Sequence, residues 1–403
     1  MIYDAIVVGA GPAGGQCARV LAQNGIKTLL IERSSHFTTN NYSTAGAPIE
    51  LVERFSLPKE VIAAHWNALA FTTPTTHHVW SSSETRGVVF DFAALRRFLA
   101  NAAQDAGAEL RMGWRFSGME KHSKGFSVSL QCQKSREIET LETRFLIDAT
   151  GAEHEIIGLN KQNPSRVLAA TGIELLVEVS QADYDRYANA LNIFFGSQWV
   201  EGGYAWVFPM EAPRLKIGIG RYFSKNTQLS TINYQETLKA FADFVLTEPP
   251  KRILDKHGKT LYYAFKRRER VFDGQLVAIG DAVSSVNPLA LEGIRHAMHS
   301  AQMAAEEISH AVKGDHHALN RYKKRMNAYC GMRWRICEWI AKRLYGHSDD
   351  RQFEAMFDAM RSWSYREVER FAFHYDLKLC VKLGITWLVH YWKRCLTSVR
   401  RKK

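Results

Sequence analysis

The first 32 residues alternate between apolar runs and a glycine-rich turn in the order of one βαβ unit. The apolar segment "YDAIVV" (3–8) precedes "GAGPAGG" (9–15), a helical pattern runs from Gln16 to Asn24, and "KTLLIE" (27–32) is a second apolar segment. Strands of a parallel sheet are covered by helices on both faces and therefore read as nearly continuous apolar runs. The pattern predicts two parallel strands joined by a helix.

Later segments change in period and divide the chain. Apolar residues at helical spacing predict a helix within 87–107, and "RFLIDATG" (144–151) predicts a buried strand that ends in a turn. Short alternating segments between Ala169 and Tyr222 predict a sheet outside the nucleotide fold, and the chain is helical from Ala297 onward. These patterns favour an α/β protein with an inserted β-rich region and a helical C-terminal region.

Composition limits the function classes only broadly. The 403 residues are 46% hydrophobic and 23% charged, which is typical of a soluble globular protein of two or three domains. A formal charge of +12 suits any polyanion, and we expect no nucleic-acid partner. Six cysteines without a CxxC pair, and the adjacent His77 and His78 without a third ligand, predict no metal site. The opening residues lack a targeting pattern, so we expect a cytoplasmic location, with peripheral membrane contact left open.

The glycine-rich turn carries the strongest motif. Gly9, Gly11 and Gly14 form GxGxxG directly after a strand, and Glu32 ends the next strand. In this context Gly9 permits a tight turn, Gly11 lets the backbone approach a pyrophosphate, and Gly14 lets the helix pack closely on the strand. The helix N-terminus favours phosphate, and Glu32 can accept hydrogen bonds from ribose hydroxyls. The unit predicts a dinucleotide site without choosing between NAD and FAD.

Two downstream segments resemble the remaining FAD signatures of the flavoprotein hydroxylase and geranylgeranyl reductase superfamily. They are "LIDATGA" (146–152) and "GQLVAIGDAVSSVNPLALEGIRHAM" (274–298). The resemblance implies that Asp281 bonds the ribityl or pyrophosphate part of FAD, and that Pro288 to Gly293 lead into a helix directed at the flavin ring. The cofactor residues that these motifs predict are Gly9, Gly11, Pro12, Ala13, Gly14, Glu32, Arg33, Gly151, Gly280, Asp281, Gly293 and Ile294.

A fourth segment, "GGYAWVFPMEAPRLKIGIG" (202–220), resembles the YxWxFP signature of geranylgeranyl reductases. The resemblance implies that Tyr204, Trp206 and Phe208 wall a cavity for an isoprenoid chain beside the flavin. An apolar wall suits such a substrate, because each buried CH₂ group contributes about 0.8 kcal/mol. Alternating aromatic residues in a sheet are also common in ordinary cores.

The chain departs from the family in the loop after the ribose acid. Ser43 and Thr44 stand where many of these reductases carry a Cys-Gly pair, Met210-Glu211 replace the usual glycine after FP, and Asp91-Phe92 replace Asp-Arg. Arg96 and Arg97 are alternative sources of the missing cation. No His or carboxylate is identified as catalytic by its spacing in the sequence. Glu292, beside Gly293, is a polar candidate with an equal claim to be a charge partner at a helix N-terminus.

The resemblance implies a doubly wound, Rossmann-like FAD-binding domain in two segments, 1–165 and 265–310. A β-rich substrate domain, 166–264, interrupts it, and a helical region, 311–403, follows. The implied function is reduction of isolated double bonds in a prenyl lipid by hydride from reduced FAD. NADPH or a small electron carrier would be the reductant, because no second GxGxxG follows. The alternatives are a flavin-dependent monooxygenase, halogenase or carotenoid cyclase, and a non-catalytic prenyl-lipid carrier. The halogenase segment WxWxIP only half matches "YAWVFP".

The C-terminal segment 377–403 combines an apolar stripe with cations. Eight Lys or Arg and no acid follow Asp376. The stripe comprises Cys380, Leu383, Trp387, Leu388, Tyr391, Trp392 and Cys395. Two hypotheses fit it: an interfacial helix on an anionic membrane, and a terminal helix that packs on the protein itself.

Overall fold

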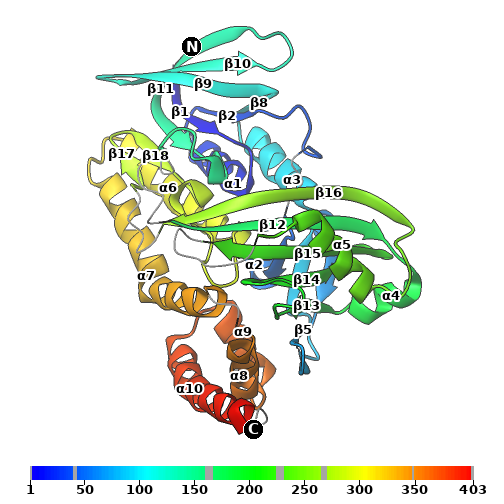
Figure 1. Ribbon diagram of the computed structural model, residues 1–403. Helices are drawn as coiled ribbons and strands as arrows, with labels where there is room; N and C mark the ends of the chain where they lie inside the picture. The colour runs from blue at the N-terminus through cyan, green and yellow to red at the C-terminus, as the bar shows by residue number, and fades with distance from the viewer. Residues whose placement is uncertain are drawn as a thin grey trace.

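The computed structural model describes residues 2–39, 43–158, 167–223, 231–264, 270–346 and 349–400. They form two large sheets, a small third sheet and a set of C-terminal helices that lie beyond the second sheet, at the bottom of the view in Figure 1. This mixed α/β architecture confirms the predicted fold class. No helix among the described residues is both long enough and apolar enough to cross a bilayer.

The first sheet is the nucleotide fold, in the order β17-β18-β11-β1-β2-β8, with β9 and β10 as an antiparallel arm on β11. Its strands are β1 (Ile2–Val8), β2 (Thr28–Glu32), β8 (Glu109–Met112), β9 (Trp114–His122), β10 (Gly125–Cys132), β11 (Ile138–Asp148), β17 (Phe272–Asp273) and β18 (Leu276–Ala278). The βαβ prediction is confirmed, since β1 and β2 pair in parallel around helix α1 (Pro12–Gln23). Its five strands from β18 to β8 are parallel; helices α1 and α3 lie in crossovers between them, and α6 packs on α1.

The second sheet has the order β16-β12-β15-β14-β13-β5-β6. Its strands are β5 (Ala68–Thr72), β6 (His77–Ser81), β12 (Val167–Glu178), β13 (Ala190–Phe194), β14 (Gly203–Pro209), β15 (Arg214–Phe223) and β16 (Arg252–Ala264). The predicted β-rich region therefore exists, and helices α4 (Gln181–Tyr187) and α5 (Tyr234–Val245) accompany it. Strands β5 and β6 join this sheet although they lie within the segment predicted for the FAD-binding domain. The predicted domain boundaries stay a prediction.

The segment 87–107 differs in part from its prediction. Its first four residues form strand β7 (Gly87–Phe90), which pairs with β3 (Gly46–Pro48) and β4 (Ile62–Trp66) in the third sheet. All four residues are buried, so this apolar run forms a strand. The helix begins after it: the Asp91 side chain caps α3 (Phe92–Asp105) by accepting a hydrogen bond from Ala94 N. A short helix, α2 (Glu50–Arg54), follows β3.

The chain from Ile294 onward is helical, as predicted for the residues after Ala297. The helices are α6 (Ile294–Val312), α7 (Ala318–Tyr345), α8 (Arg351–Met360), α9 (Tyr365–Ala372) and α10 (Leu377–Arg400). Helix α6 packs on α1 under the first sheet, and α7 bends at Gly331, whose φ is 42°. The chain beyond the bend turns back toward the second sheet, where Tyr345 stacks on Tyr222 of β15 with ring centroids 4.0 Å apart.

Candidate functional site

The turn between β1 and α1 is open on the side where a phosphate would approach. Gly9 has φ 106°, and a Cβ there would lie 2.5 Å from the Ala149 oxygen. A Cβ on Gly14 would lie 1.8 Å from the Gly9 oxygen, so this glycine sets how closely α1 packs on the strand. A Cβ on Gly11 would meet no atom within 4 Å, and no side chain caps the N-terminus of α1. The turn thus presents open backbone and a positive helix end.

Glu32 lies at the carboxyl end of β2, beside this turn. Its Oε2 accepts a bond from Ala10 N at 3.1 Å, and its Oε1 accepts one from Ser34 N at 2.9 Å. Arg96 of α3 is buried and donates to Glu32 Oε2 at 3.2 Å and to the Ala10 oxygen at 3.3 Å. Of the two arginines considered as the missing cation, Arg96 therefore contacts the turn, whereas Arg97 is exposed.

Asp281 lies opposite, in the 3₁₀ turn Gly280–Val283 that follows β18. Its Oδ1 is buried and has no hydrogen-bond partner among the described protein atoms. Burial raises the pKa of Asp281 above its usual value, and the neighbouring Lys259 and Ser285 oppose this effect. A buried acceptor in this position is suited to a hydroxyl donor on a bound molecule.

Two further glycines complete the cradle. Gly293 stands at the N-cap of α6, which no side chain caps, and a Cβ there would lie 3.7 Å from Asp281 Oδ1. Gly151 has φ 71°, and a Cβ there would meet no atom within 4 Å. Two uncapped helix ends, an open glycine turn and a buried unpartnered acceptor fit a dinucleotide with a long polyhydroxyl link, which is the shape of FAD. The role of each residue in binding it stays a prediction.

One cavity of about 470 Å³ joins the predicted cofactor residues to the predicted substrate residues. It is lined by Gly9, Gly11, Pro12, Glu32, Arg33, Gly151, Asp281, Gly293 and Ile294, and also by Tyr204, Trp206 and Phe208. Ala13, Gly14 and Gly280 lie behind this lining, where a Cβ on Gly280 would be 2.8 Å from Ala13 Cβ. The sequence-predicted residues thus converge on one place from four distant segments of the chain.

One face of the second sheet borders this cavity. The pairing register of its strands determines which residues lie side by side on that face. One row of paired residues crosses six strands, from β5 to β16: Phe71, Ile193, Trp206, Gly218, Glu174 and His257. The β5, β13 and β14 end of the row is apolar, and the β12 and β16 end is charged. Apart from Gly218, all of these residues line the cavity. The cavity therefore has an apolar side and a charged side on a single sheet.

Trp206 lies across the boundary between the two sides. Its Nε1 donates to Glu174 Oε2 at 2.7 Å, and a Cβ on Gly218 would lie 2.2 Å from the indole. Gly218 therefore allows the indole to lie flat over β15 and reach Glu174 on β12. This fixes one wall of the cavity in a single orientation.

The charged side is a buried cluster that the sequence reasoning missed. Glu174 is 2% exposed and Lys216 is 4% exposed. Lys216 Nζ donates to the backbone oxygens of Ser43 and Thr44 at 2.5 and 3.2 Å, so it holds the loop that departs from the family pattern. His257 Nε2 lies 3.4 Å from Glu174 Oε1. The sequence signal that could have identified Glu174 and Lys216 is a single charged residue within each of the apolar runs "GIELL" and "LKIGIG".

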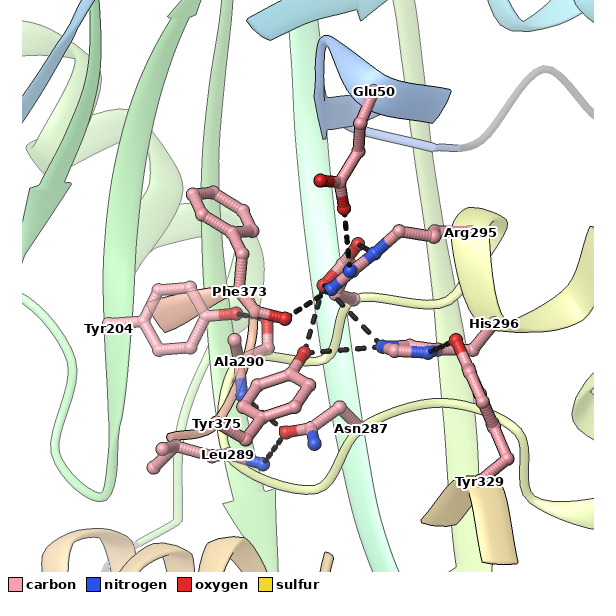
Figure 2. A network of polar contacts seen from close by, with 11 residues as sticks. Glu50, Tyr204, Asn287, Leu289, Ala290, Arg295, His296, Tyr329, Phe373 and Tyr375 are labelled. Carbon is pink, nitrogen blue, oxygen red and sulfur yellow. Dashed lines mark hydrogen bonds and ion pairs between the residues drawn. The ribbon is translucent and has the colours of Figure 1, made fainter. Parts of the chain in front are cut away.

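The C-terminal helices form part of the cavity wall. Leu344, Tyr345, Met356, Phe371 and Phe373 contribute to its lining. Figure 2 shows how the residues after α9 contact the start of α6: Arg295 donates to the Phe373 backbone oxygen, and Tyr375 Oη donates to Glu292 Oε2 at 2.9 Å.

Glu292 is a structural ion-pair partner in this network. Arg295 Nε and Nη2 donate to its two oxygens at 2.6 and 2.7 Å, and His296 Nε2 lies 3.5 Å away. Burial alone raises the pKa of Glu292, but Arg295 and His296 outweigh burial and hold it well below its usual range. A carboxylate held ionised by a bidentate arginine is a poor proton donor, so the geometry favours the charge-partner hypothesis for Glu292.

His77 and His78 lie on the edge strand β6, away from the cavity lining, and His77 Nδ1 is 2.9 Å from Thr72 Oγ1. Among the described residues, no three His, Cys, Asp or Glu side chains gather as metal ligands would.

Two reductases are similar to this chain in sequence over most of their length. Digeranylgeranylglycerophospholipid reductase 3 of Methanosphaera stadtmanae is 24% identical over 357 residues, covering 86% of this chain and 88% of that protein. The reductase of that name from Haloferax volcanii is 28% identical over 322 residues, covering 77% and 76%.

Solved structures share the fold. A geranylgeranyl bacteriochlorophyll reductase-like protein from Thermoplasma acidophilum superposes with a TM-score of 0.79 at 20% identity, covering 95% of both chains. A flavin-dependent brominase superposes with a TM-score of 0.67 at 14% identity, covering all of both chains. The model of the FAD binding domain family matches residues 2–330, which is most of the chain. The chain therefore belongs to the FAD binding domain family.

Proposed function

We propose that this FAD-dependent oxidoreductase reduces isolated double bonds in the prenyl chain of a lipid. The observation that carries the proposal is the apolar side of the cavity, which faces the predicted cofactor residues across one continuous space. Its walls come from β5, β13 and β14 and from the C-terminal helices, in particular Phe71, Ile193, Phe208, Met356 and Phe371. The curated relatives named above are reductases of geranylgeranyl lipids, which supports the same substrate class.

Prenyl chains offer no polar group for recognition, so binding must come from burial. Each buried CH₂ group contributes about 0.8 kcal/mol to binding. Aromatic side chains can bury such groups and have few rotamers of their own to lose. Trp206 is held by Glu174 and by the glycine beneath it, so it can orient the chain as well as contact it. Phe371 and Phe373 add further apolar contacts to the lining of the cavity.

Bound reduced FAD would supply the hydride for the reduction. The protein's task is to hold one alkene carbon within reach of the cofactor and to provide a proton for the other. NADPH or a small electron carrier is our proposed reductant, and it is supported by the absence of a second GxGxxG motif in the sequence.

The decisive experiment is anaerobic. Protein reduced with dithionite is mixed with a geranylgeranyl lipid or with its saturated analogue, and flavin absorbance and lipid mass are followed. We expect the flavin to reoxidise only with the unsaturated lipid, which gains two hydrogens per flavin. Reoxidation by oxygen alone would favour a monooxygenase or halogenase, and a flavin that resists reduction would favour a lipid carrier.

We also propose peripheral contact with anionic membrane through α10. The structure divides the predicted stripe: Cys380, Leu383 and Trp387 are buried, and Trp387 Nε1 donates to the Gln352 oxygen of α8 at 3.0 Å. A second apolar stripe on the same helix is exposed, and it comprises Val381, Ile385, Leu388, Val389 and Trp392. Exposed apolar residues at spacings of three and four, on a helix rich in Lys and Arg, support contact with a lipid surface.

A further inference from the structure

The charged side of the cavity contains a histidine between two carboxylates. His257 Nδ1 lies 2.8 Å from Asp255 Oδ2, and its Nε2 lies 3.4 Å from Glu174 Oε1. Glu174 and His257 are direct cross-strand partners on β12 and β16, so the register of the sheet sets this contact. Both residues line the cavity.

The three side chains form a path from solvent to the cavity. The Asp255 side chain is 41% exposed, that of His257 is 12% exposed, and that of Glu174 is 3% exposed. Asp255 is therefore in contact with bulk water, while Glu174 lies in the interior. The exposed carboxylate of Asp255 can therefore pass a proton from water to the His257 imidazole, which lines the cavity.

We propose that His257 donates the proton that completes the reduction, with Glu174 and Asp255 as positioning residues. The inference rests on the proposed function. The π bond of the alkene opens, one carbon receives a hydride from the bound cofactor, and its neighbour receives a proton from His257. The two electrons lost by the cofactor reside in the new C–H bond formed by the hydride. The neutral imidazole then regains a proton from water by way of Asp255.

Local charges favour the protonated imidazole. Burial alone lowers the pKa of His257, but Glu174 and Asp255 outweigh burial and raise it above its usual value. Lys216 on β15 and Lys259 on β16 are the cations on the same face, and Lys216 neutralises part of the charge on Glu174. A histidine with a raised pKa can hold a proton near neutral pH and still release it.

Two tyrosines that line the cavity are engaged in hydrogen bonds with the backbone. Tyr204 Oη donates to the Ala290 oxygen at 3.0 Å, and Tyr345 Oη donates to the Leu289 oxygen at 3.2 Å. Burial raises the pKa of both tyrosines beyond the range in which they exchange protons at neutral pH. Glu292 is held ionised by Arg295. His257 is distinguished from these groups by its contact with a solvent-exposed carboxylate.

The test uses His257→Gln, which keeps a polar side chain of similar size but cannot carry the proton. Lys256→Gln is the matched control, because it also removes a cation from β16 but lies exposed on the opposite face of the strand. Each protein is loaded with FAD, reduced anaerobically and mixed with a geranylgeranyl lipid across the pH range in which histidine titrates. Lipid affinity is measured in a separate experiment, by the quenching of tryptophan fluorescence.

We expect His257→Gln to bind FAD and lipid as the wild type does, but to reduce the lipid roughly 10²-fold more slowly. The wild-type rate should fall as pH rises through the pKa of His257, and the variant should lack this limb. NMR titration of the imidazole, in the protein without lipid, should show the pKa falling in Glu174→Gln.

The outcomes separate the two proposals. Unchanged rate and pH profile in His257→Gln, beside an active wild type, would overturn the role of His257 alone. An imidazole pKa unaffected by Glu174→Gln would also count against it. If neither the wild type nor Lys256→Gln reduces the lipid, the proposed function itself fails.

Discussion

Trp206 and Glu174 are joined by a hydrogen bond of 2.7 Å that crosses an intervening strand at Gly218. The bond exists because Gly218 leaves room for the indole, and it connects the apolar and charged sides of the cavity. Substrate orientation and proton supply would therefore depend on one contact, which can be disturbed without touching the predicted cofactor residues.

Gly218→Val should displace the indole and impair lipid reduction more than FAD binding. A Cβ at this position would lie 2.2 Å from Trp206, and overpacking of this kind typically costs about 1–3 kcal/mol. Thermal unfolding, flavin content and lipid turnover are the measurements, with Trp206→Ala for comparison. Gly118→Val on β9 is the control, since a Cβ there meets no atom within 4 Å. Equal losses of flavin and turnover would contradict the prediction.

Gly11→Val should yield a folded protein that does not retain FAD. The new side chain meets no protein atom at its Cβ, so it can be accommodated, but it would occupy the space where the pyrophosphate approaches. Gly14→Val is the contrasting variant: its Cβ would lie 1.8 Å from the Gly9 oxygen, so we expect it to destabilise the fold itself. Circular dichroism and flavin absorbance distinguish the two. A yellow Gly11→Val protein would overturn our assignment of this turn.

Glu292→Gln should destabilise the protein in a pH-dependent way. Removing one partner of a buried ion pair typically costs about 3–5 kcal/mol, and Arg295 would keep only the half-exposed Glu50 as a charge partner. The folded-state pKa of Glu292 is depressed, so its contribution is present above the unfolded pKa of about 4.3 and is lost as pH falls through the folded pKa.

The measurement is the free energy of unfolding in denaturant at several pH values. The difference between wild type and Glu292→Gln should be largest near neutral pH and should shrink in acid. Glu120→Gln, at an exposed position on β9, is the control and should show no such trend. A constant difference at all pH values would mean that the carboxylate charge is not what stabilises this loop.

The predicted cofactor residues could be proposed from local motifs alone, and the structure brings most of them to one cavity. Gly9 to Gly14, Glu32 and Asp281 each lie at the end of a strand whose apolar run is visible in the sequence. The charged side was not predictable, because Glu174 and His257 meet only through the register of a long antiparallel pair. The same holds for Phe371 and Phe373, which reach the cavity from a helical region with no cofactor motif.

The C-terminal stripe shows a different limit. The period of the apolar residues predicted a helix correctly, but two apolar faces share that helix. The neighbouring helices, chiefly α8, decide which face is covered, and these contacts lie outside any local pattern. The sequence could name the stripe but could not say that Leu388 and Trp392 face away from the protein.

The exposed face of α10 leads to a final prediction about membrane contact. Ile385 and Leu388 are 64% and 47% exposed, so aspartate at both positions should leave the packing on α8 intact. The double substitution places two carboxylates where apolar side chains would enter the lipid interface, and it opposes the attraction of basic residues, about 1 kcal/mol each near an anionic surface. We expect the wild type to sediment with anionic vesicles at low salt, and the variant to stay in solution with its FAD bound.

Point substitutions test this surface more sharply than deletion of residues 377–403, because deletion would also uncover the apolar contact of Leu383 and Trp387 with the rest of the protein. Ile138→Asp is the control: Ile138 is 62% exposed on β11, so it adds a carboxylate at an equally exposed apolar position remote from α10. It should sediment as the wild type does. High salt should weaken wild-type binding through screening of the cations. Equal sedimentation of the double variant and the wild type would show that this face of α10 does not contact lipid.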